Sequence, residues 1–400
     1  MNVLPDEQEI EVQQTVAQFL KTECTPALIR ASELGYTGYS KELWDKFASL
    51  GWLTLCLPED VGGQALPITY LGLLLEEVGR YIAPLPVHST MVPALIIAKY
   101  GSPEQRALLK RVGAGDLIMS FAATGKSGVW SPDALSVKGR RDGDDMVLSG
   151  ASYFVDHFIT SEKSLVAFRL LDEHTGREEL AVVLVDTASK GITVEQLHPM
   201  AKDSECVVGF DGVRIPATNL VGPSGPFGQS GKSAGIINDL QNYAAVFLVS
   251  QMQGAARQAM ESAVEYVNNR EAFGQPIGAF QAIQHMAADM VNAVDGSQLL
   301  AREAIWRLSQ GMPADAEVSQ AKAFANEKCL MVCRSAQQMF GGLGFITECD
   351  INLWFRRVAS WSLRCGTTYE HRARVASILL DRKGRVRLDA YLGSTSPAAA

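Results

Sequence analysis

The residues best suited to bind a charged ligand lie around Arg270, at a break between two helical patterns. Apolar residues recur at helical spacing over residues 255–267, and Pro276 then interrupts the chain, because proline cannot continue a helix. A second helical pattern starts at Phe280 and carries Gln281 in its first turn. A guanidinium at such a corner, with glutamines beyond it, suits a bound pyrophosphate. The same pattern also fits a plain helical hairpin with an exposed arginine.

A glycine-rich block follows further along the chain, from Gln338 to Glu348. It reads Gln-Met-Phe-Gly-Gly-Leu-Gly-Phe-Ile-Thr-Glu, and it is similar to the Gln-x-x-Gly-Gly-x-Gly-Tyr segment of the acyl-CoA dehydrogenase family. The corner from Arg270 to Gln284 resembles that family's Arg-x-x-Phe-Gly-x-x-Ile-x-x-Phe-Gln-x-x-Gln signature. The two motifs occur in the family's order, so together they are a more specific signal than either one alone.

The resemblance implies flavin adenine dinucleotide (FAD) as the cofactor, bound across a dimer interface. Arg270 is then expected to meet the pyrophosphate of an FAD in a neighbouring subunit, and the backbone of residues 338–342 is expected to meet its adenosine. The expected cofactor residues of the corner and the block are Arg270, Phe273, Phe280, Gln281, Gln338, Gly341 and Gly342.

Composition and charge limit the class of protein. The chain has 400 residues, 47% hydrophobic and 20% charged, which is ordinary for a globular protein of two or three domains. Its formal net charge of -8 argues against nucleic acid as a main partner, because binding to a phosphate backbone needs a basic face. The N-terminus lacks a secretory pattern, and no apolar run reaches the length of a membrane span. Seven scattered cysteines favour reduced thiols, so we predict a cytoplasmic protein without a membrane span or a metal site.

Hydrophobic periodicity divides the chain into three parts. Residues 1–117 carry helical patterns, residues 118–228 carry short apolar strands with turns between them, and residues 229–386 carry four or five long helical patterns. Residues 387–400 are small and polar, and we expect them to be disordered. The predicted fold class is α+β, with an N-terminal helical domain, a middle antiparallel β-domain and a C-terminal four-helix bundle, as in acyl-CoA dehydrogenases.

The family's flavin site also uses a β-domain loop of the form Thr-Glu-Pro-x-x-Gly-Ser. Here Thr124 matches the threonine, Gly-Lys replaces Glu-Pro, and Ser131 falls one residue late. The next family element, Trp-Ile-Thr, is replaced by Tyr-Phe-Val. The ring of Tyr153 is expected to pack on the flavin, or else to belong to an aromatic core strand, and Val155 offers its backbone N–H. Thr367, which follows Cys-Gly, completes the expected cofactor residues.

The carboxylate that dehydrogenation requires is missing from both positions that the family uses. An acyl-CoA dehydrogenase needs a base for the α-proton while a hydride leaves the β-carbon for the flavin. The usual glutamate would stand at Cys365, the alternative glutamate would stand at Ala244, and an arginine that anchors substrate in many relatives would stand at Ala245. The catalytic residue is therefore unknown. Cys365 is favoured as a small packed side chain over a thiol base, and the family pattern does not support a role for Glu370.

Three functions remain in competition. The first, which the missing positions favour, is the base-lacking subunit of a hetero-oligomeric acyl-CoA dehydrogenase acting on the acyl-CoA of a steroid or another bulky acid. Its partners would be a homologous subunit, with a heterotetramer favoured over a homo-oligomer, and an electron-transfer acceptor. Some steroid-degrading relatives carry the same glycine-rich block followed by two arginines, as at Arg356 and Arg357 here. The second function is a self-sufficient homo-oligomer with an unusual base, and the third is a flavin-dependent monooxygenase on the same fold.

Overall fold

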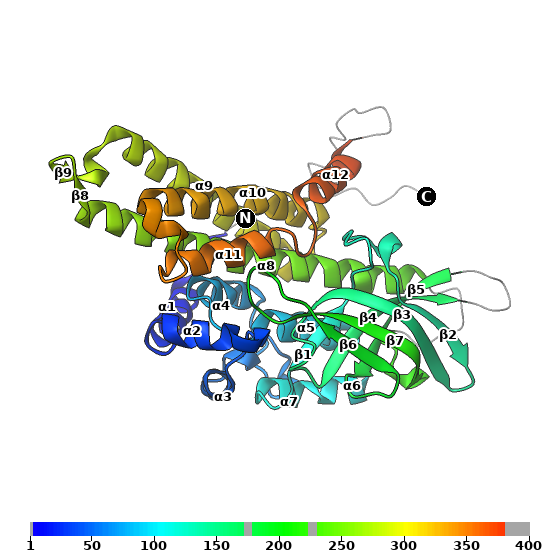
Figure 1. Ribbon diagram of the computed structural model, residues 1–400. Coiled ribbons are helices and arrows are strands. Elements are labelled where there is room, and N and C mark those ends of the chain that lie inside the picture. The colour runs from blue at the N-terminus through cyan, green and yellow to red at the C-terminus, as the bar shows by residue number, and fades with distance from the viewer. Residues whose placement is uncertain (1–2, 172–177, 223–229, 381–400) are drawn as a thin grey trace.

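The N-terminal part of the chain is helical. A computed structural model describes residues 3–171, 178–222 and 230–380 of the protein (Figure 1). Ser40 and Ser102 explain where two of its helices begin, because each side-chain oxygen accepts a hydrogen bond from the backbone N–H three residues on. The α-helices of this part are α1 (Glu7–Glu23), α2 (Pro26–Glu33), α3 (Lys41–Ser49), α4 (Thr69–Arg80), α5 (Val87–Tyr100), α6 (Pro103–Ala107) and α7 (Leu109–Gly113).

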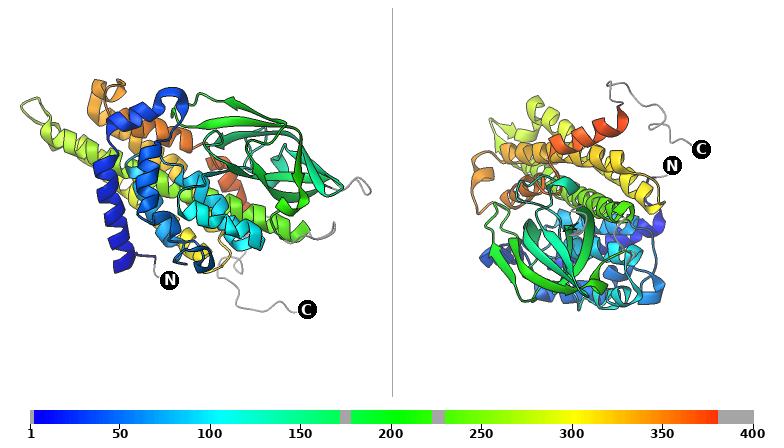
Figure 2. Two further views of the ribbon diagram at one scale, coloured as in Figure 1. Left: turned by 90° about the horizontal axis from the view of Figure 1, so that it is seen from below. Right: turned by 90° about the vertical axis from the view of Figure 1, so that its right-hand side faces the viewer.

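The middle part is one curled sheet (Figure 2). Strands β3, β7 and β6 pair antiparallel, and β2 and β3 form a hairpin. Strand β4, however, pairs in parallel with both β1 and β2, so the prediction of an antiparallel domain is wrong for these two pairs. Strand direction depends on how the connections cross the sheet, and apolar alternation carries no information about it. The strands are β1 (Met119–Ala122), β2 (Lys138–Asp142), β3 (Asp145–Asp156), β4 (Lys163–Leu171), β5 (Glu178–Asp186), β6 (Ile192–Gln196) and β7 (Glu205–Pro216).

The last part is a helical bundle built around α8, so the predicted helical–β–helical order is confirmed. Helix α8 spans about 60 Å at about 1.5 Å per residue. It contacts α4, α5, α9, α10 and α11 as well as β5, and therefore joins all three parts (Figure 2). The helices of the bundle are α8 (Ser230–Asn269), α9 (Gln281–Ser309), α10 (Asp315–Phe340), α11 (Ile351–Trp361) and α12 (Thr368–Leu379).

Two predictions from the sequence concern where parts of the chain begin and end. The domain boundaries at residues 117 and 228 stay predictions, and residues 387–400 lie outside the described part of the chain. Across the described residues, none of the helices has the length and hydropathy that crossing a membrane requires.

Gly254 in α8 allows α4 to approach closely. A Cβ atom at this position would lie 1.9 Å from the backbone oxygen of Glu76 in α4. We expect Gly254→Ala to destabilise the protein by about 1–3 kcal/mol or more, because two helix backbones must move apart. Gly235→Ala in the same helix is the matched control, since a Cβ there meets nothing within 4 Å. Thermal unfolding followed by circular dichroism measures both variants, and equal stability would contradict the close contact.

Candidate functional site

A cavity of about 470 Å³ lies between the β-domain and the C-terminal bundle. The β-domain contributes β1 and the loop after it, β3, and the start of β7. The bundle contributes the end of α11 and the loop that leads to α12. This cavity therefore combines the segments in which the sequence places the flavin ring. The lining residues that bear on its chemistry are Thr124, Ser127, Trp130, Phe154, Asp156, Glu205, Arg364, Cys365 and Thr367.

On β3 the residues that line the cavity each lie one position after a residue predicted to contact the cofactor. Phe154 and Asp156 line the cavity, whereas Val155 is buried in the β-domain core. The cause is a bulge: the pairing of β3 with β7 changes register between Ser152 and Val155, and Phe154 has a positive φ of 57°. The β3 side chains that line the cavity are thus Phe154 and Asp156, and a contact of the Tyr153 ring or the Val155 backbone N–H with a cofactor stays a prediction.

The loop after β1 forms a second wall. The carbonyl oxygen of Thr124 accepts hydrogen bonds from the backbone N–H of Tyr153 (3.0 Å) and from the hydroxyl of Ser152 (3.1 Å), so this loop is tied to β3. The indole Nε1–H of Trp130 is buried and has no hydrogen-bond partner among the described residues. Ser131 does not line the cavity, because its hydroxyl caps the short turn that follows. A ligand atom that accepts a hydrogen bond from Trp130 would satisfy this buried donor.

The loop between α11 and α12 is a tight turn held by buried side chains. Cys365 and Gly366 have positive φ values of 52° and 96°. The carbonyl oxygen of Cys365 is hydrogen-bonded to Nε2 of His371 (2.8 Å), and that of Gly366 accepts from Nδ2 of Asn326 (3.1 Å). A Cβ atom on Gly366 would lie 2.4 Å from the ring of His371, so the turn requires glycine there. These contacts fix Cys365 at the cavity wall.

Both carboxylate oxygens of Glu370, near the start of α12, accept hydrogen bonds. Its carboxylate accepts hydrogen bonds from the backbone N–H of Thr367 (2.7 Å), the hydroxyl of Thr367 (2.6 Å) and the backbone N–H of Trp130 (2.7 Å). Burial alone would raise the pKa of Glu370, but these hydrogen bonds lower it. Thr367 lines the cavity with its hydroxyl committed to this carboxylate. Glu370 therefore joins the β-domain loop to α12 and is not available as a base.

Neither of the usual base positions holds a competent base. Burial raises the pKa of the Cys365 thiol to about 12, so the thiol is protonated at neutral pH. Ala244 and Ala245 are fully buried in α8, and neither lines the cavity. Among the described residues, the carboxyl groups that do line it belong to Asp156 and Glu205, which the sequence analysis did not single out.

The Arg270 corner is exposed at the end of α8, away from the β-domain (Figure 1). Arg270 directly follows α8, and its guanidinium has no ion-pair partner within the part of the chain that the structure describes. The two short strands β8 (Glu271–Ala272) and β9 (Gln275–Pro276) form the turn. Phe273 at its tip is 92% exposed and meets Phe280 edge-to-face. Such exposure of a cation and a large aromatic ring together is typical of an interaction surface.

The glycine-rich block lies beside this corner. Tyr266 near the end of α8 stacks on Phe340 at the end of α10, with ring centroids 4.3 Å apart. Gly341 follows with a φ of 62° and a ψ of -139°, a conformation that glycine adopts readily and other residues do not. Gln338 and Gly342 are exposed, as is Gln281 in the first turn of α9. The structure thus brings the two sequence motifs onto one exposed surface, and their contact with a cofactor stays a prediction.

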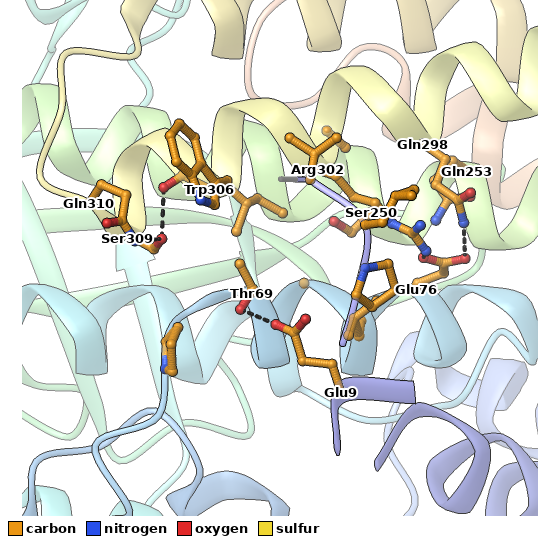
Figure 3. Close-up of a pocket in the computed structure, with 18 residues that line it drawn as sticks. Glu9, Thr69, Glu76, Ser250, Gln253, Gln298, Arg302, Trp306, Ser309 and Gln310 are labelled. Carbon is orange, nitrogen blue, oxygen red and sulfur yellow. Dashed lines mark hydrogen bonds and ion pairs between the residues drawn. The ribbon is translucent and has the colours of Figure 1, made fainter. Parts of the chain in front are cut away.

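A second cavity of about 220 Å³ lies between α4, α8 and α9 and is partly covered by residues near the N-terminus (Figure 3). Glu76 of α4 accepts a hydrogen bond from Nε2 of Gln298 (2.7 Å) and lies 3.6 Å from the guanidinium of Arg302. The charged groups at this end of the cavity are therefore paired with each other, and none of its residues belongs to the matched motifs. We accordingly assign the ligand chemistry to the larger cavity.

The residues of the larger cavity fit the ring system of a flavin. Phe154 offers an aromatic ring, and the unpaired indole N–H of Trp130 offers a donor to a heterocycle rich in acceptor atoms. The candidate phosphate-binding residue, Arg270, lies instead at the far end of α8 (Figures 1 and 2). The residues suited to the ring and those suited to the phosphates are therefore separate within one chain.

Comparison with known protein families covers both helical parts. The acyl-CoA dehydrogenase N-terminal domain matches residues 6–116, and the acyl-CoA dehydrogenase C-terminal domain matches residues 236–380. Cyclohex-1-ene-1-carbonyl-CoA dehydrogenase of Geobacter metallireducens is 29% identical over 380 residues, which cover 92% of this chain and 96% of that protein. The mitochondrial short-chain specific acyl-CoA dehydrogenase of Mus musculus is 27% identical over 386 residues, covering 94% of this chain and 91% of that protein.

Solved structures give the same result. A variant of the Tcur3481-Tcur3483 steroid ACAD is 27% identical and superposes with a TM-score of 0.83, covering 93% of this chain and 97% of that one. Butyryl-CoA dehydrogenase from Megasphaera elsdenii, at 21% identity and a TM-score of 0.85, has the same fold over 94% of this chain and 99% of its own. The chain belongs to the acyl-CoA dehydrogenase family of flavin-dependent oxidoreductases, whose members bind FAD.

Proposed function

We propose that the chain is the base-lacking subunit of a hetero-oligomeric acyl-CoA dehydrogenase, which introduces a double bond between the α and β carbons of an acyl-CoA thioester. This reaction requires a carboxylate that removes the α-proton, and FAD, when bound, would supply the acceptor for the hydride of the β-carbon. The observation that carries the proposal is that neither position used by the family holds a competent base, in a chain that keeps the exposed corner at Arg270. The base would come from a homologous subunit that has glutamate before its Gly-Thr pair.

The exposed corner supports a role in the FAD site of a neighbouring subunit. Arg270 points to no carboxylate of the described chain, and Phe273 is 92% exposed beside it. Because this surface lies away from the chain's own cavity, we infer that Arg270 and residues 338–342 contact an FAD whose ring lies in the partner (Figure 1). A guanidinium–phosphate contact is charge-assisted, and it would satisfy a side chain that is otherwise unpaired.

The state of the cavity argues against a self-sufficient enzyme. The Cys365 thiol is protonated at neutral pH, and the Glu370 carboxylate is occupied by three hydrogen bonds. The remaining carboxyl groups on the wall, those of Asp156 and Glu205, are held in ion pairs with Arg364. A homo-oligomer would therefore need a base at a position other than the two that the family uses.

We further propose that the acyl group is bulky or ring-bearing, and that electrons leave through a separate acceptor protein. Two of the similar proteins support the first point, because one is a cyclohex-1-ene-1-carbonyl-CoA dehydrogenase and the other is a steroid ACAD. The steroid ACAD, Tcur3481-Tcur3483, carries a double name, which agrees with an assembly of two different chains. Turnover assays with cyclohexene, steroid side-chain and straight-chain acyl-CoA substrates test the preference.

The purified protein, alone or with its partner, is expected to carry FAD rather than FMN. The Arg270 corner and residues 338–342 are the part of the site that best matches the family, and they are assigned to the pyrophosphate and adenosine, which FMN lacks. Extraction of the flavin followed by chromatography measures this directly. FMN as the only flavin would contradict the assignment of the corner.

Cys365→Ala is expected to cost little activity in the assembled enzyme, because the thiol is not the base. The measurement is bleaching of the flavin by acyl-CoA across a range of pH. A thiol base would instead make bleaching depend on Cys365 and rise with pH as thiolate forms, although burial raises the pKa of this thiol to about 12. The matched control is replacement of the partner's glutamate by glutamine, which should abolish bleaching. Loss of bleaching in Cys365→Ala alone would overturn this part of the proposal.

A further inference from the structure

The second cavity, between α4, α8 and α9, takes no part in the flavin site, yet three of its polar side chains make no hydrogen bond with another described residue. These are Gln253 and Ser250 of α8 and Arg302 of α9. Gln253 is 1% exposed and Ser250 is 3% exposed. Oε1 of Gln253 and Nε of Arg302 are buried without a partner among the described residues. Because buried polar groups are nearly always paired, we expect the missing partner to lie in the cavity.

The three side chains lie at the same end of the cavity (Figure 3). Gly254, directly after Gln253, approaches the backbone of α4 at Glu76, and the guanidinium of Arg302 lies 3.6 Å from the Glu76 carboxylate. This separation is longer than a hydrogen bond, so the N–H groups of Arg302 remain able to donate. The amide of Gln253 and the hydroxyl of Ser250 can each donate and accept. This end of the cavity therefore offers donors and acceptors together.

Apolar side chains and a missing side chain give the cavity room for a short hydrocarbon. Leu73 of α4 and both Ile305 and Trp306 of α9 line it. Gly72 keeps the space beside Ser250 open, because a Cβ atom there would lie 2.8 Å from Cδ1 of Ile305 and 3.8 Å from the hydroxyl oxygen of Ser250. The volume of about 220 Å³ is below the range of about 300–1,000 Å³ that is typical for drug-sized ligands. The occupant must therefore be small.

The charges on the cavity wall disfavour an ionic occupant. Among the residues that line the cavity, Glu9 and Glu76 are acidic and Arg302 is basic. Glu76 accepts a hydrogen bond from Nε2 of Gln298 (2.7 Å) and faces Arg302. Glu9 accepts a hydrogen bond from the hydroxyl of Thr69. An anion would meet more carboxylates than cations, and a cation would meet Arg302 beside carboxylates that already have partners.

We propose that this cavity is a binding site for a small neutral molecule with a carboxamide head and a short apolar body. A primary carboxamide has two N–H donors and a carbonyl oxygen that accepts twice, so a single head can pair with Gln253, Ser250 and Arg302. A hydroxyl has one donor and satisfies fewer of these groups. The body packs on Leu73, Ile305 and Trp306 and leaves water.

Saturation-transfer NMR titration of the full-length chain tests the site with four probes that share one six-carbon skeleton: hexanamide, hexanoate, hexylamine and 1-hexanol. We expect saturable binding of hexanamide, and a Kd at least about tenfold higher for each of the other three, because each leaves a buried polar group unpaired or brings a charge. Neither FAD nor acyl-CoA is needed. The result is therefore independent of the assignment of this chain as the base-lacking subunit.

Gln253→Met keeps the shape of the side chain and removes its amide. We expect it to raise the Kd for hexanamide by roughly tenfold or more, without lowering the Tm, because the lost amide has no partner in the described structure. Ser250→Ala is a second, smaller change with the same expected direction. Gln241→Met is the matched control, since Gln241 is also a buried glutamine of α8 with an unpaired amide nitrogen, but it does not line this cavity. It should leave the Kd unchanged.

Several outcomes would overturn the proposal. No saturable binding of hexanamide would mean that water alone fills the cavity. Equal or tighter binding of the acid, the amine or the alcohol would contradict the carboxamide head. Unchanged affinity in both Gln253→Met and Ser250→Ala would place the binding elsewhere, and a large fall in the Tm of Gln253→Met would show that its amide has a structural partner. Thermal unfolding followed by circular dichroism reports the Tm of each variant.

Discussion

Replacement of Arg270 by alanine is expected to weaken FAD binding to the assembled protein by roughly 10- to 150-fold. A charge-assisted contact between a guanidinium and a phosphate contributes about 1.5–3 kcal/mol. Each 1.4 kcal/mol changes a dissociation constant by about tenfold. Arg270 has no ion-pair partner within the described chain, so its removal should cost little stability and act mainly on the cofactor. The flavin content after gel filtration and the Kd for FAD report the loss.

Two further variants make this result specific. Arg270→Lys keeps the charge but loses the planar two-pronged geometry, so we expect an intermediate loss of affinity. Arg141→Ala removes an exposed arginine from the β2–β3 hairpin, in the β-domain and away from the corner, and should leave FAD binding unchanged. Full flavin occupancy in Arg270→Ala would show that Arg270 is an ordinary surface residue with no role in FAD binding.

The two turns whose positions the sequence predicted correctly are those that short motifs define. Arg270 follows a helix that ends where the periodicity ends, and Pro276 and Gly274 mark the turn. The glycine-rich block starts at Gln338, and the structure places it beside the corner through the Tyr266–Phe340 stack. Residues that are close together in the sequence determine both turns, so the local sequence is sufficient to predict where they lie.

The side chains of β3 that line the cavity could not be predicted, because a bulge is not visible in the alternation of apolar and polar residues. The register change between Ser152 and Val155 places Phe154 and Asp156 on the cavity wall, one residue after each predicted position, Tyr153 and Val155. A single extra residue on one strand exchanges the two faces of the strand that follows it. The only sequence sign was an acidic residue directly after an apolar strand.

The ion pairs of Arg364 could not have been predicted from the sequence at all. Asp156, Asp203 and Arg364 are far apart in the chain, and they meet only because the β-domain packs against the loop after α11. Each of them, taken alone, looks like an ordinary surface charge, so their contact is a property of the tertiary structure.

Addition of a homologous subunit that carries the glutamate is expected to convert the chain from an inactive protein into part of an active enzyme. A positioned general base contributes roughly 10²–10⁴-fold to a rate, and the described cavity of this chain contains none at the usual positions. If the partner lacks a corner like that at Arg270, we therefore expect the turnover rate of the mixture to exceed the sum of the two separate rates by roughly 10²–10⁴-fold. Arg270→Ala in the mixture should remove most of the gain.

The most direct test of the base-lacking assignment is the turnover of an acyl-CoA by a homogeneous preparation of this chain, measured with an artificial electron acceptor and FAD in excess. The same assay is then repeated after equimolar mixing with the glutamate-bearing homologue. We expect background rates for the chain alone at every pH, and activity after mixing that depends on the partner's glutamate and not on Cys365. Robust turnover by the homogeneous chain would contradict it.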